Sequence, residues 1–257
     1  MDKKYFFFDI DGTLVDNQTK EIVPSALETL NLLQQNGHFV AIATGRAHYK
    51  AIHFSKSVGI KNMICNGGYG IVVNEELIEN RPLDREKSIA LYQEAIRLGY
   101  GVLLALDDSQ YVTSQDMQFI KQVGYRNEPT TYLIDSDFDI HQVENIYKIY
   151  VAISSKEEDK LTLKDTLGHL RFVEEYLMFQ NDDKKWGVCK MMDLLNANYK
   201  DVVVFGDDFN DLVMFDKYWY SIAMGNACDE LKQKADYICD TNINDGIYKV
   251  CREKGWI

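Results

Sequence analysis

The sequence lacks several features that would place it outside the ordinary globular proteins. No stretch approaches the roughly 18 apolar residues of a transmembrane helix, and no run of five or more basic residues occurs. The 5 cysteines form no C-x-x-C pair that could make a zinc knuckle or a redox motif. With 46% hydrophobic and 26% charged residues, the 257-residue chain has the composition of a folded protein with a sizeable core. Disordered, collagen-like and coiled-coil proteins are therefore excluded.

The charge balance disfavours two classes of partner. The chain has 28 Lys and Arg against 40 Asp and Glu, a net charge of −12. Because a negative surface repels phosphate backbones and anionic lipids, we expect neither a nucleic-acid nor a membrane partner. Lys3 and Lys4 precede the apolar run Tyr5–Phe8, but Asp9 ends that run too early for a signal peptide. The expected location is the cytoplasm.

Strand and helix patterns alternate along the first part of the chain, as in a parallel sheet covered by helices. The unbroken apolar run Tyr5–Phe8 predicts a strand that is buried on both faces. Leu27, Leu30 and Leu33 share one face of a predicted helix that begins after Pro24. Further elements are predicted in the same alternation: strands at 39–43 and 62–65, and a helix at 46–58.

The pattern changes beyond about Pro82 and resumes at about Lys184. A helix at 85–98 and a strand at 101–106 are predicted in between, and a helix at 188–195 and a strand at 202–205 after it. The simplest interpretation is an α/β protein with a Rossmann-like parallel-sheet core domain formed by residues 1–81 and 183–257. A second α/β domain, residues 82–182, is inserted into it on two linkers and is expected to move relative to its host.

Two clusters of carboxylates follow predicted buried strands. Asp9-Ile10-Asp11-Gly12-Thr13 follows the first strand, and Gly206-Asp207-Asp208-Phe209-Asn210-Asp211 follows the strand at 202–205. Ligands bind beyond the carboxyl ends of parallel strands, so we expect both clusters at one edge of the sheet. Gathered carboxylates repel each other unless a hard cation neutralises them, and oxygen ligands favour Mg²⁺ over zinc or copper. The sequence therefore predicts a Mg²⁺ site.

A hydroxyl and an ammonium are predicted near the same edge. Thr44-Gly45-Arg46 follows the strand at 39–43, and Lys184, with Lys185 beside it, begins a helix. Such groups hold the oxygens of a phosphoryl group and offset its charge during transfer. Each is a common structural feature when it occurs alone, so the interpretation depends on their combination with the carboxylates.

In this order the four segments resemble the haloacid dehalogenase (HAD) superfamily of phosphatases. Its motifs are D-x-D-G-T, a strand-ending Thr or Ser, a lysine, and G-D-x-x-N-D. Four further features are similar to the Cof-type subfamily: Thr44-Gly45-Arg46, Asn66-Gly67, the spacing Lys184-x-x-Gly187-Val188, and Met224-Gly225-Asn226-Ala227. About 140 residues separate Thr44 from Lys184, so the inserted domain lies between the second and third motifs. The resemblance identifies it as a cap domain of type IIB (C2B).

The resemblance implies a Mg²⁺-dependent phosphatase for phosphomonoesters of small cytosolic metabolites, such as sugar phosphates or phosphorylated cofactors. Asp9 would form an aspartyl-phosphate, and Asp11 would act as general acid and base. The metal ligands would be the carboxylates of Asp9 and Asp207 and the backbone carbonyl of Asp11. The other implied roles are catalysis for Thr44 and Lys184, phosphate or substrate binding for Gly45, Arg46 and Asn210, and support of the metal's ligands for Asp208 and Asp211.

Several alternatives stay open at this stage. The spacing to Gly187-Val188 favours Lys184 as the functional lysine, but Lys185 is its neighbour. Asp208 stands where the family often has glycine, and Asp tolerates a left-handed backbone better than most residues. A phosphomutase that needs a bisphosphate activator, or a catalytically silent metal-dependent binding or regulatory protein, would fit the same motifs. We expect a small-molecule substrate and a monomer or weak homo-oligomer.

Overall fold

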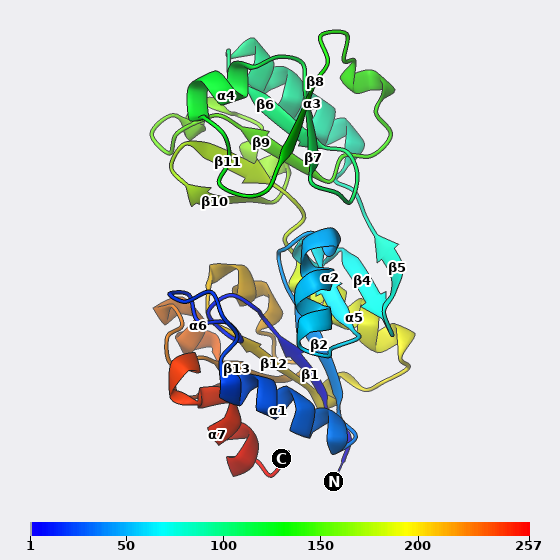
Figure 1. The fold of residues 1–257 in the computed structure, drawn as a ribbon, viewed down its shortest axis with the longest axis vertical. Helices are drawn as coiled ribbons and strands as arrows, with labels where there is room; N and C mark the ends of the chain where they lie inside the picture. Colours follow the sequence, from blue (N-terminus) through cyan, green and yellow to red (C-terminus); the bar gives the residue numbers. More distant parts are fainter. Residues whose placement is uncertain (1) are drawn as a thin grey trace. The chain divides into compact units, whose positions relative to one another are not determined.

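A computed structural model describes residues 2–257, which form two compact units (Figure 1). The core unit comprises the chain up to Asn80 together with Asp183–Ile257, and the inserted unit comprises Arg81–Asp182. The chain therefore leaves the core unit after Asn80 and returns to it at Asp183.

The core unit is built on one eight-stranded sheet with the strand order β14-β13-β12-β1-β2-β3-β4-β5. Its first six members in that order are parallel to one another, which confirms the predicted parallel sheet. They are β1 (Tyr5–Phe8), β2 (Phe39–Ala43), β3 (Met63–Cys65), β12 (Val202–Gly206), β13 (Tyr220–Ala223) and β14 (Tyr237–Ile238). Two antiparallel strands complete one side, β4 (Gly70–Val73) and β5 (Glu76–Asn80).

Strand β1 is buried on both faces because it lies between β2 and β12 and helices cover both sides of the sheet. Phe6 and Phe8 face one hydrophobic cluster, whereas Phe7 faces the other. All three rings are fully buried, and the ring of Phe8 stacks on Phe205 of β12 with centroids 4.6 Å apart. This two-sided burial explains why the apolar run of β1 is unbroken.

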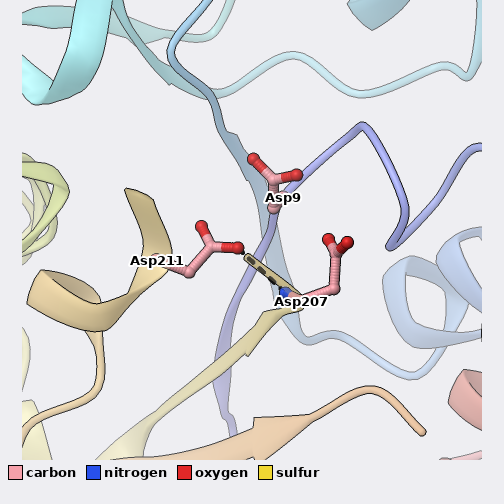
Figure 2. Close-up of side chains that lie close together, drawn as sticks. All are labelled: Asp9, Asp207 and Asp211. Atoms are coloured by element: carbon pink, nitrogen blue, oxygen red, sulfur yellow. Dashed lines mark hydrogen bonds between the residues drawn. The ribbon is translucent and has the colours of Figure 1, made fainter. Parts of the chain in front are cut away.

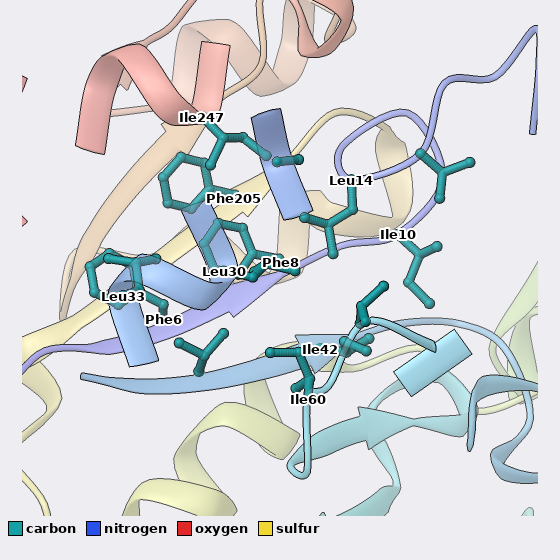
Figure 3. Packing of buried hydrophobic residues seen from close by; sticks show 14 of the residues in the cluster. Phe6, Phe8, Ile10, Leu14, Leu30, Leu33, Ile42, Ile60, Phe205 and Ile247 are labelled. Atoms are coloured by element: carbon teal, nitrogen blue, oxygen red, sulfur yellow. The ribbon is translucent and has the colours of Figure 1, made fainter. Parts of the chain in front are cut away.

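Helices of the core unit pack on these two faces. Helix α1 (Pro24–Gln35) buries Leu30 and Leu33 against Phe6 and Phe8, together with Ile247 of α7 (Figure 3). The first face carries α1, α2 (His48–Ser57) and α7 (Gly246–Glu253), and the second carries α5 (Lys184–Leu194) and α6 (Asp229–Lys234). Burial of one such aromatic or leucine side chain stabilises the fold by roughly 1.5–3 kcal/mol.

The inserted unit has a six-stranded sheet with the order β10-β11-β9-β6-β7-β8. Its strands are β6 (Val102–Ala105), β7 (Tyr111–Ser114), β8 (Thr131–Ile134), β9 (Lys148–Val151), β10 (His169–Val173) and β11 (Tyr176–Phe179). Helix α3 (Arg85–Arg97) packs with one hydrophobic cluster of this unit, and Phe119 of α4 (Gln118–Val123) packs with the other. The predicted helix at 85–98 and strand at 101–106 are confirmed.

Two expected boundaries differ from the structure. Helix α5 begins at Lys184 rather than at 188, because the carboxylate of Asp183 accepts a hydrogen bond from the backbone N of Trp186 and caps it. Helix α2 begins at His48 rather than at 46. Short 3₁₀ segments complete the structure: Asn66–Gly68, Ile140–Gln142, Glu158–Lys160, Lys164–Thr166, Tyr199–Asp201, Phe209–Met214 and Asn242–Asn244.

No helix between residues 2 and 257 is both long enough and apolar enough to span a bilayer.

Candidate active site

Three buried carboxylates meet at the carboxyl ends of the central strands (Figure 2). Asp9 directly follows β1, Asp207 directly follows β12, and Asp211 lies in the 3₁₀ segment Phe209–Met214. One carboxylate oxygen of each lies within 4.8 Å of the others, and no residue of the three is more than 7% exposed. Because β1 and β12 are parallel neighbours, their ends bring Asp9 and Asp207 to one edge of the sheet.

Lys184 is the cation of this cluster. Its Nζ donates hydrogen bonds to Oδ1 of Asp9 and to Oδ1 of Asp211, both at 2.6 Å, and the residue is fully buried. Burial alone would lower the pKa of Lys184, but the carboxylates of Asp211 and Asp9 raise it above its ordinary value. The ammonium therefore stays charged.

Lys185, the other candidate lysine, lies elsewhere. Its Nζ pairs with Oδ2 of Asp216 at 2.7 Å, and its side chain is 36% exposed. The geometry thus brings Lys184, and not Lys185, into contact with Asp9.

Asp211 holds the loop after β12. Its Oδ2 accepts hydrogen bonds from the backbone N of Asp207 at 2.9 Å and of Asp208 at 3.2 Å, while Oδ1 accepts from Lys184. Both of its oxygens are therefore occupied by protein donors. Asp208 is exposed and caps the 3₁₀ segment by accepting a hydrogen bond from the backbone N of Phe209. Its φ is −127°, so the loop does not require a left-handed residue at this position.

Asp207 is held against the loop that follows β1. The hydroxyl of Thr13, which is fully buried, donates to its Oδ1 at 2.9 Å. Gly12 has φ +87°, and a Cβ at that position would lie 2.0 Å from Oδ2 of Asp207. Glycine is therefore required here both by the backbone conformation and by the closeness of the carboxylate.

The carboxylates fit a hard divalent cation. When ionised, Asp9, Asp207 and Asp211 place three negative charges against the single positive charge of Lys184, and all four groups are buried. Burial and the charge of Asp211 raise the pKa of Asp207 to about 7, and burial raises the pKa of Asp9 well above its ordinary value, although Lys184 opposes this. Among residues 2–257, the other oxygens of Asp9 and Asp207 have no hydrogen-bond partner. The site is thus an uncompensated, oxygen-only donor set, as Mg²⁺ prefers.

Asp11 and Arg46 form an ion pair beside this cluster. Nη2 of Arg46 lies 2.6 Å from Oδ1 of Asp11, and Nε donates to Oδ2 at 3.0 Å. The side chain of Arg46 is 34% exposed and that of Asp11 is 47% exposed. The carboxylate of Asp11 is therefore not part of the buried group of three. The guanidinium of Arg46, the predicted substrate contact, holds it in a two-point contact.

The remaining predicted residues lie at the ends of the neighbouring elements. Thr44 follows β2, is 1% exposed, and its Oγ1 accepts a hydrogen bond from the backbone N of Arg46 at 3.1 Å. Gly45 lies between them and is half-buried, as is Asn210 in the 3₁₀ segment Phe209–Met214.

Two residues at this edge of the sheet carried no predicted role. Asn226 donates from Nδ2 to the backbone O of Gly12 at 2.8 Å, and Asn242 donates from Nδ2 to the backbone O of Val15 at 3.0 Å. The only sequence signal for Asn226 was the similarity of Met224-Gly225-Asn226-Ala227 to the Cof-type pattern, which gave no function, and no motif included Asn242.

Comparisons of the whole sequence find related proteins. A sequence model of the haloacid dehalogenase-like hydrolases matches residues 6–251. A putative phosphatase of Bacillus subtilis, YkrA, is 29% identical and aligns over 99% of both chains. The 5-amino-6-(5-phospho-D-ribitylamino)uracil phosphatase YitU of the same organism is 26% identical over 95% of both chains.

Solved structures give the same result for the fold. A hypothetical protein from Geobacillus kaustophilus superposes with a TM-score of 0.83 at 27% identity, with 100% of both chains covered. A HAD subclass IIB sugar phosphatase superposes with a TM-score of 0.78 at 24% identity and covers 99% of this chain and 100% of its own. The second likeness concerns the fold alone.

Proposed function

Because the chain belongs to the haloacid dehalogenase-like hydrolases, is of the Cof type and is a phosphomonoesterase, we propose a mechanism through a covalent aspartyl-phosphate with Mg²⁺ as cofactor. One observation carries the proposal. Asp9 is a buried carboxylate at the end of the central strand, with one oxygen held by a buried lysine and the other without a protein partner among residues 2–257.

In the first step the free oxygen of Asp9 attacks the phosphorus atom, a P–O bond forms, and the bond to the leaving alcohol breaks. Lys184 fixes the other oxygen and offsets the charge that gathers on the phosphoryl group. Asp11 donates a proton to the departing oxygen and then takes one from the water that hydrolyses the acyl phosphate. Both oxygens of Asp11 accept hydrogen bonds from Arg46 in the structure, so at least one of these contacts must open when Asp11 carries the proton.

The cation would be held by the carboxylates of Asp9 and Asp207 and by the backbone carbonyl of Asp11. When bound, Mg²⁺ supplies the positive charge that offsets repulsion between an anionic nucleophile and an anionic phosphate ester. Asp211 would support the metal site without binding the metal itself, because both of its oxygens already accept hydrogen bonds from Lys184 and the loop amides. We assign the phosphoryl oxygens to Thr44, to the backbone at Gly45 and to Asn210, and leave Asp208 as the cap of its segment.

The net negative charge of the chain and the presence of the inserted unit support a class of substrate. We propose phosphomonoesters of small metabolites, sugar phosphates or phosphorylated cofactors, with a cytoplasmic location and without nucleic-acid or membrane partners. The inserted domain, residues 82–182, would be the cap that selects the leaving group, and residues 1–81 with 183–257 the domain that performs the chemistry. A monomer or weak homo-oligomer suffices, since every assigned residue lies in one chain.

The test is a panel of phosphate esters with and without Mg²⁺, comparing wild type with Asp9→Asn. Wild type should release free phosphate only with the metal, and Asp9→Asn should lose at least about 10³-fold in rate, as expected for a missing nucleophile. Asp229→Asn, an exposed carboxylate of the same unit, serves as the matched control and should keep its activity. Wild-type rates in Asp9→Asn would contradict the assignment. An isomerised product would indicate a phosphomutase, and binding without turnover a silent binding protein.

A further inference from the structure

We propose that Asn226 and Asn242 are positioning residues of this site, which together fix the two peptide groups flanking Gly12 and thereby the backbone carbonyl of Asp11. The inference rests on the proposed function, because it assigns these asparagines to the cation that the function requires. It concerns residues of the core unit only.

Gly12 has few conformational restraints of its own. Its φ of +87° and the 2.0 Å distance from a would-be Cβ to Asp207 Oδ2 leave no alternative to glycine. Glycine, however, is the residue with the widest choice of backbone conformations. Gly12 has no side chain that could hold the loop in place. A loop that presents a carbonyl to a metal through such a residue therefore benefits from restraints supplied by other segments.

Asn226 restrains the peptide after Gly12. Its Nδ2 donates to the carbonyl oxygen of Gly12 at 2.8 Å, across 214 positions of sequence. Its Oδ1 accepts a hydrogen bond from the backbone N of Asn242 at 3.0 Å. The amide of Asn226 therefore connects the loop after β1 with the segment around Asn242.

Asn242 restrains the peptide before Gly12. Its Nδ2 donates to the carbonyl oxygen of Val15 at 3.0 Å, and the same oxygen accepts from the backbone N of Gly12 at 2.9 Å. In a planar trans peptide the C=O and N–H groups point in opposite directions, and the described residues contain no cis peptide bond. The direction of the Gly12 N–H group therefore fixes that of the Asp11 carbonyl, which faces away from Val15.

A neutral asparagine suits positions 226 and 242 for an electrostatic reason. A lysine or arginine here would be attracted by the carboxylates of Asp9 and Asp207, whereas an amide supplies donors and an acceptor without net charge. Asn242 is 6% exposed and its Oδ1 accepts from the backbone N of Ile243, so its orientation is itself fixed. The two asparagines thus add restraints from the C-terminal part of the chain to the hydrogen bonds that the loop makes within itself, such as those from the backbone N of Leu14 and Val15 to the O of Ile10.

The test compares Asn226→Ala and Asn242→Ala with Asn62→Ala. Asn62 is a matched control in the same unit, because its Nδ2 also donates to a backbone carbonyl, that of Val40 at 3.2 Å, and its Oδ1 also accepts from a backbone N, that of Asn74 at 3.0 Å. Mg²⁺ binding to the free protein is measured by titration calorimetry, and the Mg²⁺ concentration for half-maximal phosphate release is measured alongside. The dissociation constant for Mg²⁺ and the half-maximal Mg²⁺ concentration should both rise about tenfold or more in the two variants, as for other residues that support metal ligands. Both should stay unchanged in Asn62→Ala.

Two further comparisons separate a positioning role from simple loosening of the fold. Asn226→Asp retains the acceptor for Asn242 but loses the donor to Gly12, and it should weaken Mg²⁺ binding despite its additional negative charge. If Asn242→Ala fails to fold, the exposed Asn226 still decides the matter. Unchanged Mg²⁺ binding in the Asn226 variants, or equal weakening in Asn62→Ala, would overturn the inference alone. A wild type that neither binds Mg²⁺ nor depends on it would overturn the proposed function as well.

Discussion

The Nζ of Lys184 lies 2.6 Å from Oδ1 of Asp9, and the two side chains are 0% and 7% exposed. A buried ion pair of this kind contributes little net stability when intact, because both charges were taken out of water to form it. Its value lies in the geometry, since it fixes one oxygen of Asp9 and leaves the other available.

Lys184→Met should therefore be strongly destabilising, because it leaves the carboxylates of Asp9 and Asp211 buried without a cation. We expect a loss of about 3–5 kcal/mol in the free energy of unfolding, measured by urea denaturation without metal, and loss of phosphatase activity. Lys185→Met is the control: its partner Asp216 is near the surface, and removing such a pair costs at most about 1 kcal/mol. Equal losses in the two variants would contradict the distinction between the lysines.

Metal-free protein should lose stability between about pH 4 and pH 7 through Asp207. Burial and the neighbouring charge of Asp211 raise its pKa from 3.8 to about 7, so the folded protein keeps a proton that the unfolded chain has released. The free energy of unfolding then falls as pH rises across this window, by at most about 4 kcal/mol for this one group.

The measurement is urea denaturation in EDTA at several pH values, with Asp207→Asn as the variant that cannot titrate at this position. The difference between wild type and variant should change with pH in the direction stated, and Mg²⁺ should restore wild-type stability at the upper end of the window. Parallel pH profiles for the two proteins would contradict the proposed titration of Asp207.

Gly187→Ala should disturb activity through the placement of helix α5. A Cβ at Gly187 would lie 2.4 Å from Cγ2 of Ile64 and 2.6 Å from the carbonyl oxygen of Gly68, so the helix must shift. Overpacking of this kind costs about 1–3 kcal/mol. Because Lys184 lies one turn before Gly187 in the same helix, the shift also displaces Lys184. Leu194→Ala, in the same helix but with a side chain that is 47% exposed, should keep its rate of phosphate release. A normal rate in Gly187→Ala would show that the contact is dispensable.

Glu94 of helix α3 should stabilise the inserted unit by a charge that depends on pH. Although burial opposes its ionisation, hydrogen bonds from the hydroxyl and backbone N of Thr162 and from the backbone N of Leu163 lower its pKa. The stabilisation is therefore present above the ordinary pKa of glutamate and is lost as pH falls through the lowered value. Glu94→Gln should cost about 1–3 kcal/mol at neutral pH and less in acid.

Hydrogen exchange of the amides in residues 162–166 would measure this effect locally. Glu86→Gln, in the exposed first turn of the same helix, should leave their exchange unchanged. Exchange in Glu94→Gln that matches wild type would show that the backbone of this loop is held by other contacts.

Local sequence patterns suffice for the positions of the central strands and of the first carboxylates. Tyr5–Phe8 and Phe39–Ala43 agree with the structure residue for residue, since a strand buried on both faces is an unbroken apolar run. Asp9 and Asp207 could be expected at one edge because each directly follows such a strand, and parallel neighbours end on the same side.

Contacts between distant segments could not be predicted in this way. Whether Arg46 contacts substrate or Asp11, and whether Asp211 faces a metal or a lysine, depends on rotamers set by the folded surroundings. Asn242 lies 227 positions from Val15, and no periodicity connects the two. Within the inserted unit, where strands are short and aromatic and polar residues mix, the pattern indicated the elements around α3 and little beyond them.

The position of β1 between β2 and β12 also governs how the protein can be made on the ribosome. One neighbour of β1 is synthesised soon after it, but the other, paired through Phe8 and Phe205, emerges only in the last part of the chain. A nascent or truncated polypeptide that stops before Val202 must expose an apolar strand edge, which invites association with other chains. Such fragments should be found in inclusion bodies or on chaperones, and not as weakly active enzyme.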